Sequence, residues 1–386
     1  MSLRFLTAGE SHGMSMTGIL DGMPAGVKIT PADFAEVLRR RRTGYGRGAR
    51  QQVETDRVQV TAGLRAGFTT GAPIALSIEN EVQKELRKSM HPFTGSDDQT
   101  AVIPVPLPGH ADLAGAVKYG LHDCRNIRER ASARETVMRA ALSVPARSLL
   151  RALGIGSLCM LEQLGSVAAD IDYLRNSDEL ATLVAENGDA FLTPDKNVIA
   201  TWKELVDSAA AASKSLGGTA AVLFWNLPTG LGSHTQHEQR LDARLAALLM
   251  SIPAVRGVEI GLAQQQAHGR CPAADPIAYS SENGWVRSTN YAGGLEGGMT
   301  NGEPLIMRFH MKPLPANAGL SSIDLKTGEP AVPAFYRSDT QALTAAAVVA
   351  ESVVAIELAS QLLAMTGGST LEQVRTSLEQ LRARQK

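Results

Sequence analysis

The chain has 386 residues, of which 38 are Lys or Arg and 39 are Asp or Glu, so its net charge is −1. This balance excludes a general binder of nucleic acid or anionic membranes, because such proteins carry an excess of basic residues. The three cysteines lack CxxC spacing, which excludes a disulfide framework and a cysteine-based metal site. No signal-peptide pattern and no uncharged apolar run of membrane-spanning length occurs, so we expect a cytoplasmic protein without a membrane partner.

Alternating apolar residues predict short strands at 3–7 and 15–20, on either side of a polar loop. Thr30, Pro31 and Asp33 are typical of a helix start, and that helix runs into four arginines before a glycine-rich break at 43–48. The other elements expected in this half are strands within 52–80, a long loop over 88–110, and helices over 112–122 and 128–152. Pro145 predicts a kink in the last of these helices.

The second half is expected to contain a loop-rich stretch over 170–200, a helix over 202–215, a strand over 219–227, a helix around Leu241–Leu249, a strand within 283–312 and a long buried helix over 341–365. Ser369 with Glu372 resembles a capping box before a last helix. No internal repeat or low-complexity linker interrupts the chain. We therefore expect one interwoven domain over 1–386, with residues 369–386 as its C-terminal helix.

Arginines gather in two stretches of the sequence. Residues 39–50 hold six arginines and no acid, which favours an anion site over a solvated helix end. In 125–136, Arg130 and Arg134 are one turn apart on the predicted helix and would share a face. The alternative there is a ladder of i,i+4 ion pairs that uses Glu129 and Glu135.

Two histidines lie in glycine-containing loops, His12 in 9–13 and His110 in 108–112, where they are exposed and suited to acid catalysis near neutral pH. Asp339 precedes the long buried helix and can handle a proton. His234 and His237 have metal-ligand spacing but no apparent third ligand, so no metal is expected.

Two Gly-Gly pairs in 293–298 predict a loop that lies against a flat or phosphorylated ligand, but no GxGxxG or P-loop pattern is present, which excludes an ATP or Rossmann site. Together with the arginines and histidines, these residues predict an α+β enzyme for a small polyanionic substrate.

Several motifs in chain order carry a family resemblance. They are Gly9-Glu10-Ser11-His12-Gly13, Arg41-Arg42-Thr43-Gly44-Tyr45-Gly46-Arg47-Gly48, Glu54-Thr55-Asp56, Pro108-Gly109-His110-Ala111-Asp112, Lys118-Tyr119-Gly120, Glu129-Arg130-Ala131-Ser132-Ala133-Arg134-Glu135-Thr136, Gly217-Gly218, Gly230-Leu231-Gly232-Ser233, Gly257-Val258-Glu259-Ile260-Gly261, Ala292-Gly293-Gly294-Leu295-Glu296-Gly297-Gly298, Met311-Lys312-Pro313 and Arg337-Ser338-Asp339. In this order, over nearly the whole chain, they resemble the chorismate synthase family.

The resemblance implies a β-α-β sandwich with helices between antiparallel sheets. It implies a lyase that converts 5-enolpyruvylshikimate 3-phosphate to chorismate and phosphate by 1,4-anti elimination, in the shikimate pathway of aromatic amino acid biosynthesis. The enzyme would require reduced FMN, without net redox change, and would be a homotetramer. NADP is the expected associated nucleotide, although no nicotinamide-dinucleotide motif is present, and a separate flavin reductase is an alternative source of reduced flavin.

The resemblance also implies roles for individual residues. His12 would protonate the departing phosphate, His110 would act as an acid towards the flavin, and Asp339 would help to relay the ring proton. The residues expected to bind the substrate are Ser11, Arg41, Arg47, Arg50, Ser132, Arg134 and Arg337. Those expected to bind the flavin are Arg130, Ala131, Ser132, Pro253, Ala254, Gly297, Lys312, Pro313, Leu314, Pro315, Ala316 and Arg337.

Three places depart from the family's usual pattern. Leu107 stands where an arginine usually precedes the His110 motif, and the segments 262–264 and 314–316 differ from the usual residues. These departures leave two alternatives beside an active lyase. One is a divergent paralogue that acts on a related cyclohexene phosphate or enolpyruvyl ether, and the other is a non-catalytic flavin- or anion-binding protein.

Overall fold

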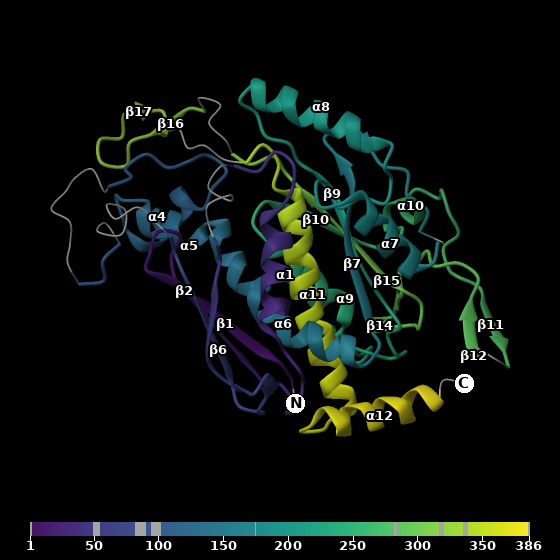
Figure 1. The fold of residues 1–386 in the computed structure, drawn as a ribbon. Helices are drawn as coiled ribbons and strands as arrows, with labels where there is room; N and C mark the ends of the chain where they lie inside the picture. Colours follow the sequence, from purple (N-terminus) through teal and green to yellow (C-terminus); the bar gives the residue numbers. More distant parts are fainter. Residues whose placement is uncertain are drawn as a thin grey trace.

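Two antiparallel sheets face each other across a layer of helices (Figure 1). The computed structural model describes residues 2–48, 55–81, 90–93, 102–173, 175–281, 284–315, 320–334 and 339–384. The first sheet has the strand order β1 (Arg4–Ala8), β2 (Ser15–Asp21), β6 (Ile74–Glu79) and β3 (Val58–Ala62). The second has the order β10 (Val255–Ile260), β15 (Leu305–Met311), β9 (Gly218–Trp225), β7 (Gly156–Leu164) and β8 (Val167–Ala168).

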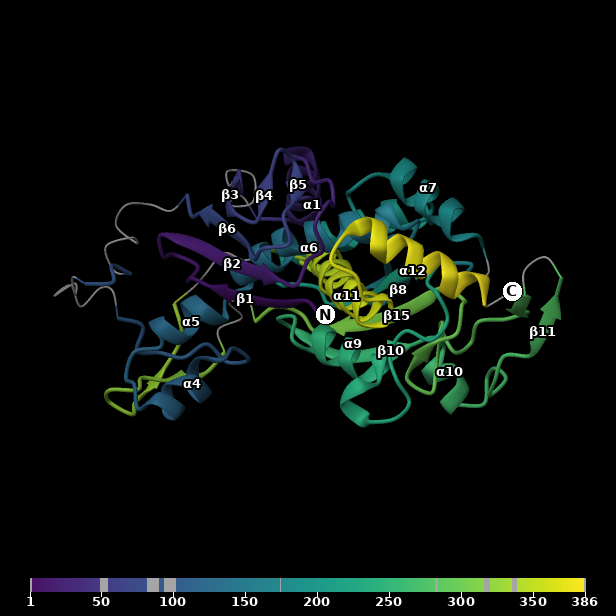
Figure 2. The ribbon, with the colours of Figure 1, turned by 90° about the horizontal axis from the view of Figure 1, so that it is seen from below.

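The helices between the sheets are α1 (Pro31–Arg42), α6 (Thr136–Ala152), α9 (Leu241–Met250) and α11 (Leu343–Thr366). Helix α6 packs against β2 and β6, α11 packs against β7 and β9, and the two helices pack against each other. Figure 2 shows both helices between β2 of the first sheet and β15 of the second. The predicted β-α-β sandwich of an α+β fold is confirmed.

Side-chain alternation explains why the first sheet has one buried face. Met16 and Leu20 of β2 and Ile74, Leu76 and Ile78 of β6 are buried, whereas most residues between them are more exposed. Such a period of two is typical of a sheet with one face on the core and one towards solvent. The helix layer therefore covers only the inner face of this sheet.

Gly18 allows α6 to lie close to β2. A Cβ atom at Gly18 would lie 2.6 Å from Cγ of Met138 and 2.7 Å from Cδ1 of Leu142, both of which belong to α6. Real Cβ atoms do not approach other atoms so closely, so a larger residue here would push the helix away from the strand.

Helix α11 is the centre of the core, and every residue from Leu343 to Ser360 is buried. It is long and apolar enough to cross a membrane, but its whole apolar window is buried inside the protein. A helix that is apolar on all sides and buried by neighbouring helices and a sheet is a core helix.

The remaining elements connect or cover this framework. The helices are α4 (Asp112–Tyr119), α5 (Arg125–Ala131), α7 (Ser177–Asn187), α8 (Val198–Ala211), α10 (Ala263–Ala267) and α12 (Leu371–Ala383), with the 3₁₀ turns η2 (Ala133–Glu135) and η3 (His237–Gln239). The two-stranded hairpins are β4 (Leu64–Arg65) with β5 (Phe68–Thr69), β11 (Ile277–Ser280) with β12 (Gly284–Arg287), β13 (Leu295–Glu296) with β14 (Met299–Thr300), and β16 (Ser322–Ile323) with β17 (Pro330–Ala331).

Local signals predicted some helix ends and missed others. Helix α1 begins at Pro31, and Thr30 and Asp33 form the expected N-terminal cap. The predicted single helix over 128–152 is wrong, because Ser132 is extended (φ −62°, ψ 144°) and separates α5 from η2 and α6. Helix α6 continues through Pro145.

Two further expectations in the second half need correction. The stretch 170–200, predicted to be rich in loops, contains α7 and the start of α8. The last helix is capped by Thr370 rather than Ser369, since the Thr370 side chain accepts a hydrogen bond from the backbone N–H of Gln373.

Candidate active site

A cavity of about 180 Å³ lies at the N-terminal end of α11. Its polar lining comes from the β1–β2 loop, the end of α1, the break between α5 and α6, and Asp339. Its apolar lining comes from the α9–β10 connection, the end of β15 and the first turns of α11. The residues expected from the sequence that line it are Ser11, Arg41, Arg47, Ser132, Arg134, Pro253, Leu314 and Asp339.

The arginines at the end of α1 diverge. Arg39 pairs with surface carboxylates, and Arg40 extends into the core, where its Nη1 lies 3.0 Å from Oε2 of buried Glu351. Arg41 lines the cavity and donates a hydrogen bond from Nη2 to the carbonyl oxygen of Ala133 at 3.1 Å. The interpretation of six arginines without a counter-charge is therefore wrong for Arg39 and Arg40. Arg39 pairs with Glu36, just before the arginine stretch, and with distant Asp189, and Arg40 pairs with distant Glu351.

Arg47 and Asp339 form an ion pair in the cavity wall. Nη1 of Arg47 lies 2.6 Å from Oδ2 of Asp339, and the backbone N–H of Gly48 donates to Oδ1 at 2.7 Å. Burial lowers the pKa of Arg47, and the Asp339 charge partly opposes this effect. Nε of Arg47 is buried and has no hydrogen-bond partner among the described residues. A bound anion would supply the acceptor that this N–H group lacks.

Arg134 and Arg130 do not share a helix face, contrary to the prediction, because of the break at Ser132. Arg134 lines the cavity and donates from Nη1 to Oδ1 of buried Asp56 at 2.6 Å. Arg130 donates from Nη1 to the carbonyl oxygen of Gly9 at 3.2 Å. In the described structure Arg130 thus holds the loop that carries His12.

His12 is fixed by a buried carboxylate. Its Nδ1 lies 2.9 Å from both carboxylate oxygens of Glu129, and its backbone N–H donates to Oε2 of Glu129 at 2.8 Å. Burial alone would raise the pKa of Glu129, but the hydrogen bonds and charge of His12 and the charge of Arg125 bring it below its usual value. Glu129 is therefore an ionised partner of the imidazole at neutral pH.

His110 has the same kind of partner. Its Nδ1 lies 2.5 Å from Oδ1 of Asp112, whose side chain is fully buried. Oδ2 of Asp112 accepts hydrogen bonds from Nε of Arg128 at 2.9 Å and from the backbone N–H of Leu107 at 3.0 Å. Against the effect of burial, the hydrogen bonds from His110, Arg128 and Leu107 and the charge of His110 lower the pKa of Asp112.

Neither histidine lines the cavity, but both loops adjoin it. His12 directly follows Ser11, which does line the cavity. The loop of His110 is joined to a segment that reaches the cavity, since Nζ of Lys312 donates to the carbonyl oxygen of Gly109 at 3.1 Å and Lys312 precedes cavity-lining Leu314 by two residues.

Most residues expected to bind a flavin gather beside this cavity. The backbone N–H of Lys312 donates to the carbonyl oxygen of Ala254 at 3.0 Å, which joins the 312–315 segment to Pro253 and Ala254. Pro315 lies near Gly109, and Ala131 and Ser132 are at the break after α5. Arg50, Ala316 and Arg337 lie outside the described residues.

Gly297 is not brought to the cavity of the same chain. Gly298 accepts a hydrogen bond from Leu241 at the start of α9, whereas Ile252 and Pro253, which line the cavity, follow the end of that helix. Ten residues of α-helix span about 15 Å. Within one chain, Gly297 is therefore separated from the other residues expected to bind flavin.

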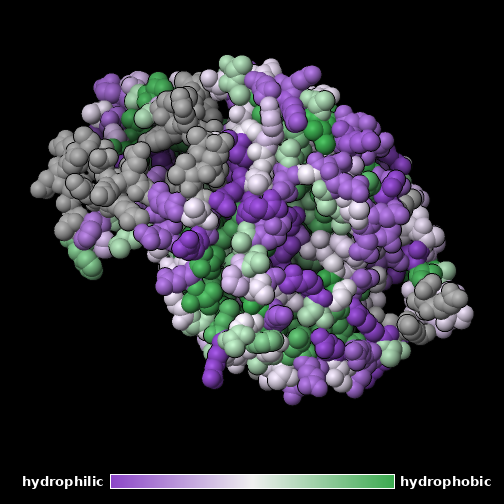
Figure 3. All heavy atoms as spheres, in the orientation of Figure 1, coloured by the Kyte–Doolittle hydropathy of each residue, from purple (hydrophilic) through white to green (hydrophobic). Residues whose placement is uncertain are grey.

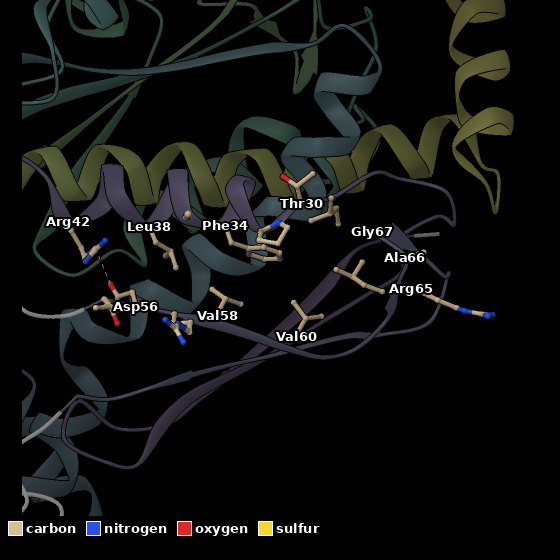
Figure 4. A pocket seen from close by; sticks show the side chains of 16 residues that line it. Thr30, Phe34, Leu38, Arg42, Asp56, Val58, Val60, Arg65, Ala66 and Gly67 are labelled. Atoms are coloured by element: carbon tan, nitrogen blue, oxygen red, sulfur yellow. Dashed lines mark ion pairs between the residues drawn. The ribbon is translucent and has the colours of Figure 1, made fainter.

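A larger cavity, of about 560 Å³, lies on the other side of α1 (Figure 4). Its walls are mainly apolar side chains of α1 and β3, such as Phe34 and Val58. In the orientation of Figure 1, hydrophobic residues gather in the region of α1 and the first sheet (Figure 3). Asp56 lines this cavity and also binds Arg134, so its carboxylate connects the two cavities.

The departures from the family pattern fall at different distances from the active-site cavity. Leu314 lines it, and Leu107 lies in the loop of His110. Gly261 and Leu262, in contrast, line a separate cavity of about 260 Å³ at the far end of β10 from Pro253. The altered 262–264 segment is therefore away from the cavity in the same chain.

Sequence reasoning missed the carboxylates that hold the site together. Glu129 was considered only as part of an i,i+4 ladder, which does form, with Nη1 of Arg125 3.5 Å from Glu129 and Nε of Arg139 2.8 Å from Glu135. A local signal existed for Asp112, which follows His110 by two residues. Asp56 and Glu129 belong to motifs that carry the family resemblance, but their partners Arg134 and His12 are 78 and 117 residues away, so no local pattern predicted these pairs.

Comparisons with known proteins agree on one family. Residues 3–363 match the family model described as chorismate synthase. The chain is 44% identical to the chorismate synthase of Trichlorobacter lovleyi over 384 residues, which cover 97% of each protein. It is 43% identical to that of Geobacter metallireducens over 388 residues, which cover 98% of each.

A solved structure supports the same conclusion. A crystal structure of chorismate synthase superimposes with a TM-score of 0.79 and 34% identity, and the match covers 100% of this chain and 98% of that one. The chain therefore belongs to the chorismate synthase family.

Proposed function

We propose that this member of the chorismate synthase family converts 5-enolpyruvylshikimate 3-phosphate to chorismate and phosphate in the cavity at the start of α11, as a carbon–oxygen lyase of the shikimate pathway. The observation that carries this assignment is the convergence of three arginines, Ser11 and Asp339 on one small cavity, with His12 next to Ser11 and the His110 loop bonded to Lys312 nearby. No observation favours a paralogue with another substrate or a non-catalytic binder, and relatives 43–44% identical over almost their whole length share one name.

The cavity wall suits a substrate with one phosphate and two carboxylates. Arg41, Arg47 and Arg134 line its polar side, and each charged hydrogen bond to a substrate oxygen contributes about 1.5–3 kcal/mol. The unsatisfied Nε of Arg47 is one donor already buried at the site. Ala345, Ala346 and Val349 provide a small apolar wall against which a cyclohexene ring packs. Arg50 and Arg337 are proposed as further substrate ligands, with Ser11 and Ser132 as neutral donors.

The two histidines act as acids at different ends of the site. His12, next to Ser11, protonates the departing phosphate, which makes it a better leaving group. His110, in the loop against Lys312, holds its proton towards the flavin. Asp339, which already accepts from Arg47 and Gly48, is placed to help to move the ring proton.

The residues beside the cavity fit a flavin. Pro253, Met311 and Leu314 are apolar and line the cavity together with the arginines, and Gly109 has φ +80° and brings its backbone close to Lys312. The proposed FMN ligands are Arg130, Ala131, Ser132, Pro253, Ala254, the segment 312–316 and Arg337. When bound, reduced FMN supplies transient electron density for loss of phosphate and regains it, so the reaction has no net redox change.

The position of Gly297 bears on the assembly. Since α9 separates Gly297 from the cavity of its own chain, its proposed contact with flavin fits a homotetramer in which a second copy brings this glycine to the site. We also assign the protein to the cytoplasm. NADP is proposed as the associated nucleotide, whose reduced form NADPH supplies the electrons that reduce the flavin, through this chain or through a separate reductase.

An anaerobic assay tests the function. Purified protein is incubated with reduced FMN and 5-enolpyruvylshikimate 3-phosphate, and chorismate and phosphate are measured together. Formation of both products in equal amounts is the expected result, and oxidised FMN serves as the control. Flavin binding without turnover would indicate a paralogue with another substrate, and absence of both would indicate a different binding protein.

A further inference from the structure

We propose that helix α5 positions both histidines, His12 through Glu129 and His110 through the Arg128–Asp112 pair, so that each ring presents Nε2 to the site. Glu129 and Asp112 are then positioning residues and not catalytic ones. The inference deepens the proposed function, on which it rests for the role of the histidines as acids.

The contact with His12 is made by both the side chain and the backbone of Glu129. The carboxylate accepts from Nδ1 of His12 at 2.9 Å and from the His12 backbone N–H at 2.8 Å, and the Glu129 carbonyl oxygen accepts from the backbone N–H of Ser11 at 3.1 Å. One residue of α5 therefore fixes the position of the loop and the rotation of the ring. A carboxylate that only held the loop would need to accept from the backbone N–H of His12 but not from Nδ1 of its ring.

The contact with His110 is made in two steps. Arg128, one residue before Glu129 on α5, donates to Oδ2 of Asp112, and Oδ1 of Asp112 accepts from Nδ1 of His110 at 2.5 Å. The Asp112 carboxylate is fully buried and also accepts from the backbone N–H of Leu107. Helix α5 thus holds both rings through adjacent residues that point to different loops.

The choice of Nδ1 has a chemical consequence. An ionised carboxylate is only an acceptor, so it keeps a proton on Nδ1 and leaves Nε2, on the opposite side of the ring, to exchange a proton with a bound molecule. Hydrogen bonds from the histidines lower the pKa of both Glu129 and Asp112 against the effect of burial, so both are ionised at neutral pH. Loss of such a partner changes the tautomer even where the fold is intact.

Three variants separate positioning from a structural role. Glu129→Gln and Asp112→Asn keep size and polarity but remove the charge, and Glu129→Asp keeps the charge with a shorter side chain. Glu135→Gln is the matched control, because Glu135 is also buried in this segment and binds Arg139 and Thr7 but no histidine. Circular dichroism and thermal unfolding first establish which variants are folded.

The first measurement is ¹⁵N NMR of ring nitrogens in protein with labelled histidine, without substrate. Wild type and Glu135→Gln should show His12 and His110 protonated at Nδ1, and Glu129→Gln should change the state of His12 alone. This readout stands even if the protein proves to catalyse another reaction. An unprotonated Nδ1 in both wild-type rings, or an unchanged His12 spectrum in Glu129→Gln, overturns the proposal.

The second measurement is a double-variant cycle on turnover. Glu129→Gln should lower kcat by roughly 10- to 1,000-fold with little change in KM, and Glu129→Asp should recover part of that loss. In a His12→Ala background, Glu129→Gln should cause no further loss, because the group it positions is absent. A full additional loss in the double variant would contradict action through His12.

Discussion

Neutralising Glu351 is expected to destabilise the protein more than any other single loss of charge on α11. Its carboxylate, 1% exposed, accepts from Nη1 of Arg40 and Nη2 of Arg147 at 3.0 Å each and from Oγ of Ser157 at 2.7 Å. Glu351→Gln would leave two largely buried guanidinium groups without a counter-charge. Breaking a buried ion pair from one side costs about 3–5 kcal/mol, which is a large fraction of the free energy of unfolding of most proteins.

The cost of Glu351→Gln depends on pH in a predictable direction. The charges of Arg147 and Arg40, against the effect of burial, hold the pKa of Glu351 far below its usual range. A group whose pKa is lower in the folded state stabilises the fold above its unfolded pKa and loses that contribution as pH falls towards the folded value. The difference in stability between wild type and Glu351→Gln should therefore be full at pH 7 and begin to shrink below about pH 4.3, the pKa of an unfolded glutamate.

Urea denaturation of both proteins at pH 7 and at pH 3.5 measures this difference. The matched control is Glu357→Gln, on the same helix, whose partner Arg244 is 38% exposed. Such a partly exposed pair contributes about 0.2–1 kcal/mol. A cost for Glu351→Gln no larger than that of Glu357→Gln, or one independent of pH, would refute the argument from buried charge.

Three further predictions follow from the site and the core. His110→Ala should retain the fold and thermal unfolding profile but lower turnover by about 10²–10⁴-fold in the anaerobic assay, because an acid is lost; unchanged activity would exclude its proposed role. Asp56→Asn suits the left-handed backbone at φ +46° but removes the negative charge that pairs with Arg134, while the hydrogen bond from Nε of Arg134 to Asn80 remains. It should lower stability by about 3–5 kcal/mol and increase the thermal shift that inorganic phosphate produces; equal shifts in both proteins would show that Arg134 does not face the anion site. Gly18→Ala should cost about 1–3 kcal/mol in urea denaturation, since its Cβ would overlap Met138 and Leu142; a neutral result would show that α6 moves freely on the sheet.

Elements with signals inside their own sequence could be predicted. The cap of α1 needs only Thr30, Pro31 and Asp33, and the burial of α11 follows from its continuous apolar sequence. The break between α5 and α6 contains neither proline nor glycine, but it does carry a local signal that the prediction of one helix over 128–152 did not use. Ser132 and Glu135 have capping-box spacing, and the Ser132 side chain accepts a hydrogen bond from the backbone N–H of Arg134. The break is also stabilised by a distant group, since Arg41 donates to the carbonyl oxygen of Ala133, which the break leaves accessible. A local cap and a tertiary contact therefore act together at this helix end.

The candidate site was predictable as a set of residues but not as a set of partners. Arginine clusters in the sequence indicated Arg41, Arg47 and Arg134, because arginine binds anions, and the family resemblance added Ser11; all four line the cavity. The acids that pair with them are not near them in the sequence. Asp339, for example, is 292 residues from Arg47, as their numbers show. The acids and bases counted in a short stretch of sequence therefore do not predict the net charge around an arginine in the folded protein.

The pairing of arginines with acids lowers the net positive charge of the proposed anion site. Three arginines and Asp339 line the cavity, and Asp56 pairs with Arg134 from the neighbouring cavity. These five groups carry a net charge of +1 rather than the large positive charge that the sequence indicated. The carboxylates hold the arginines in place before a ligand arrives, which lowers the entropy lost on binding. A substrate anion that binds Arg47 competes with Asp339 for the same guanidinium. Since we propose that Asp339 helps to move the ring proton, this competition would couple substrate binding to the release of the Asp339 carboxylate from Arg47.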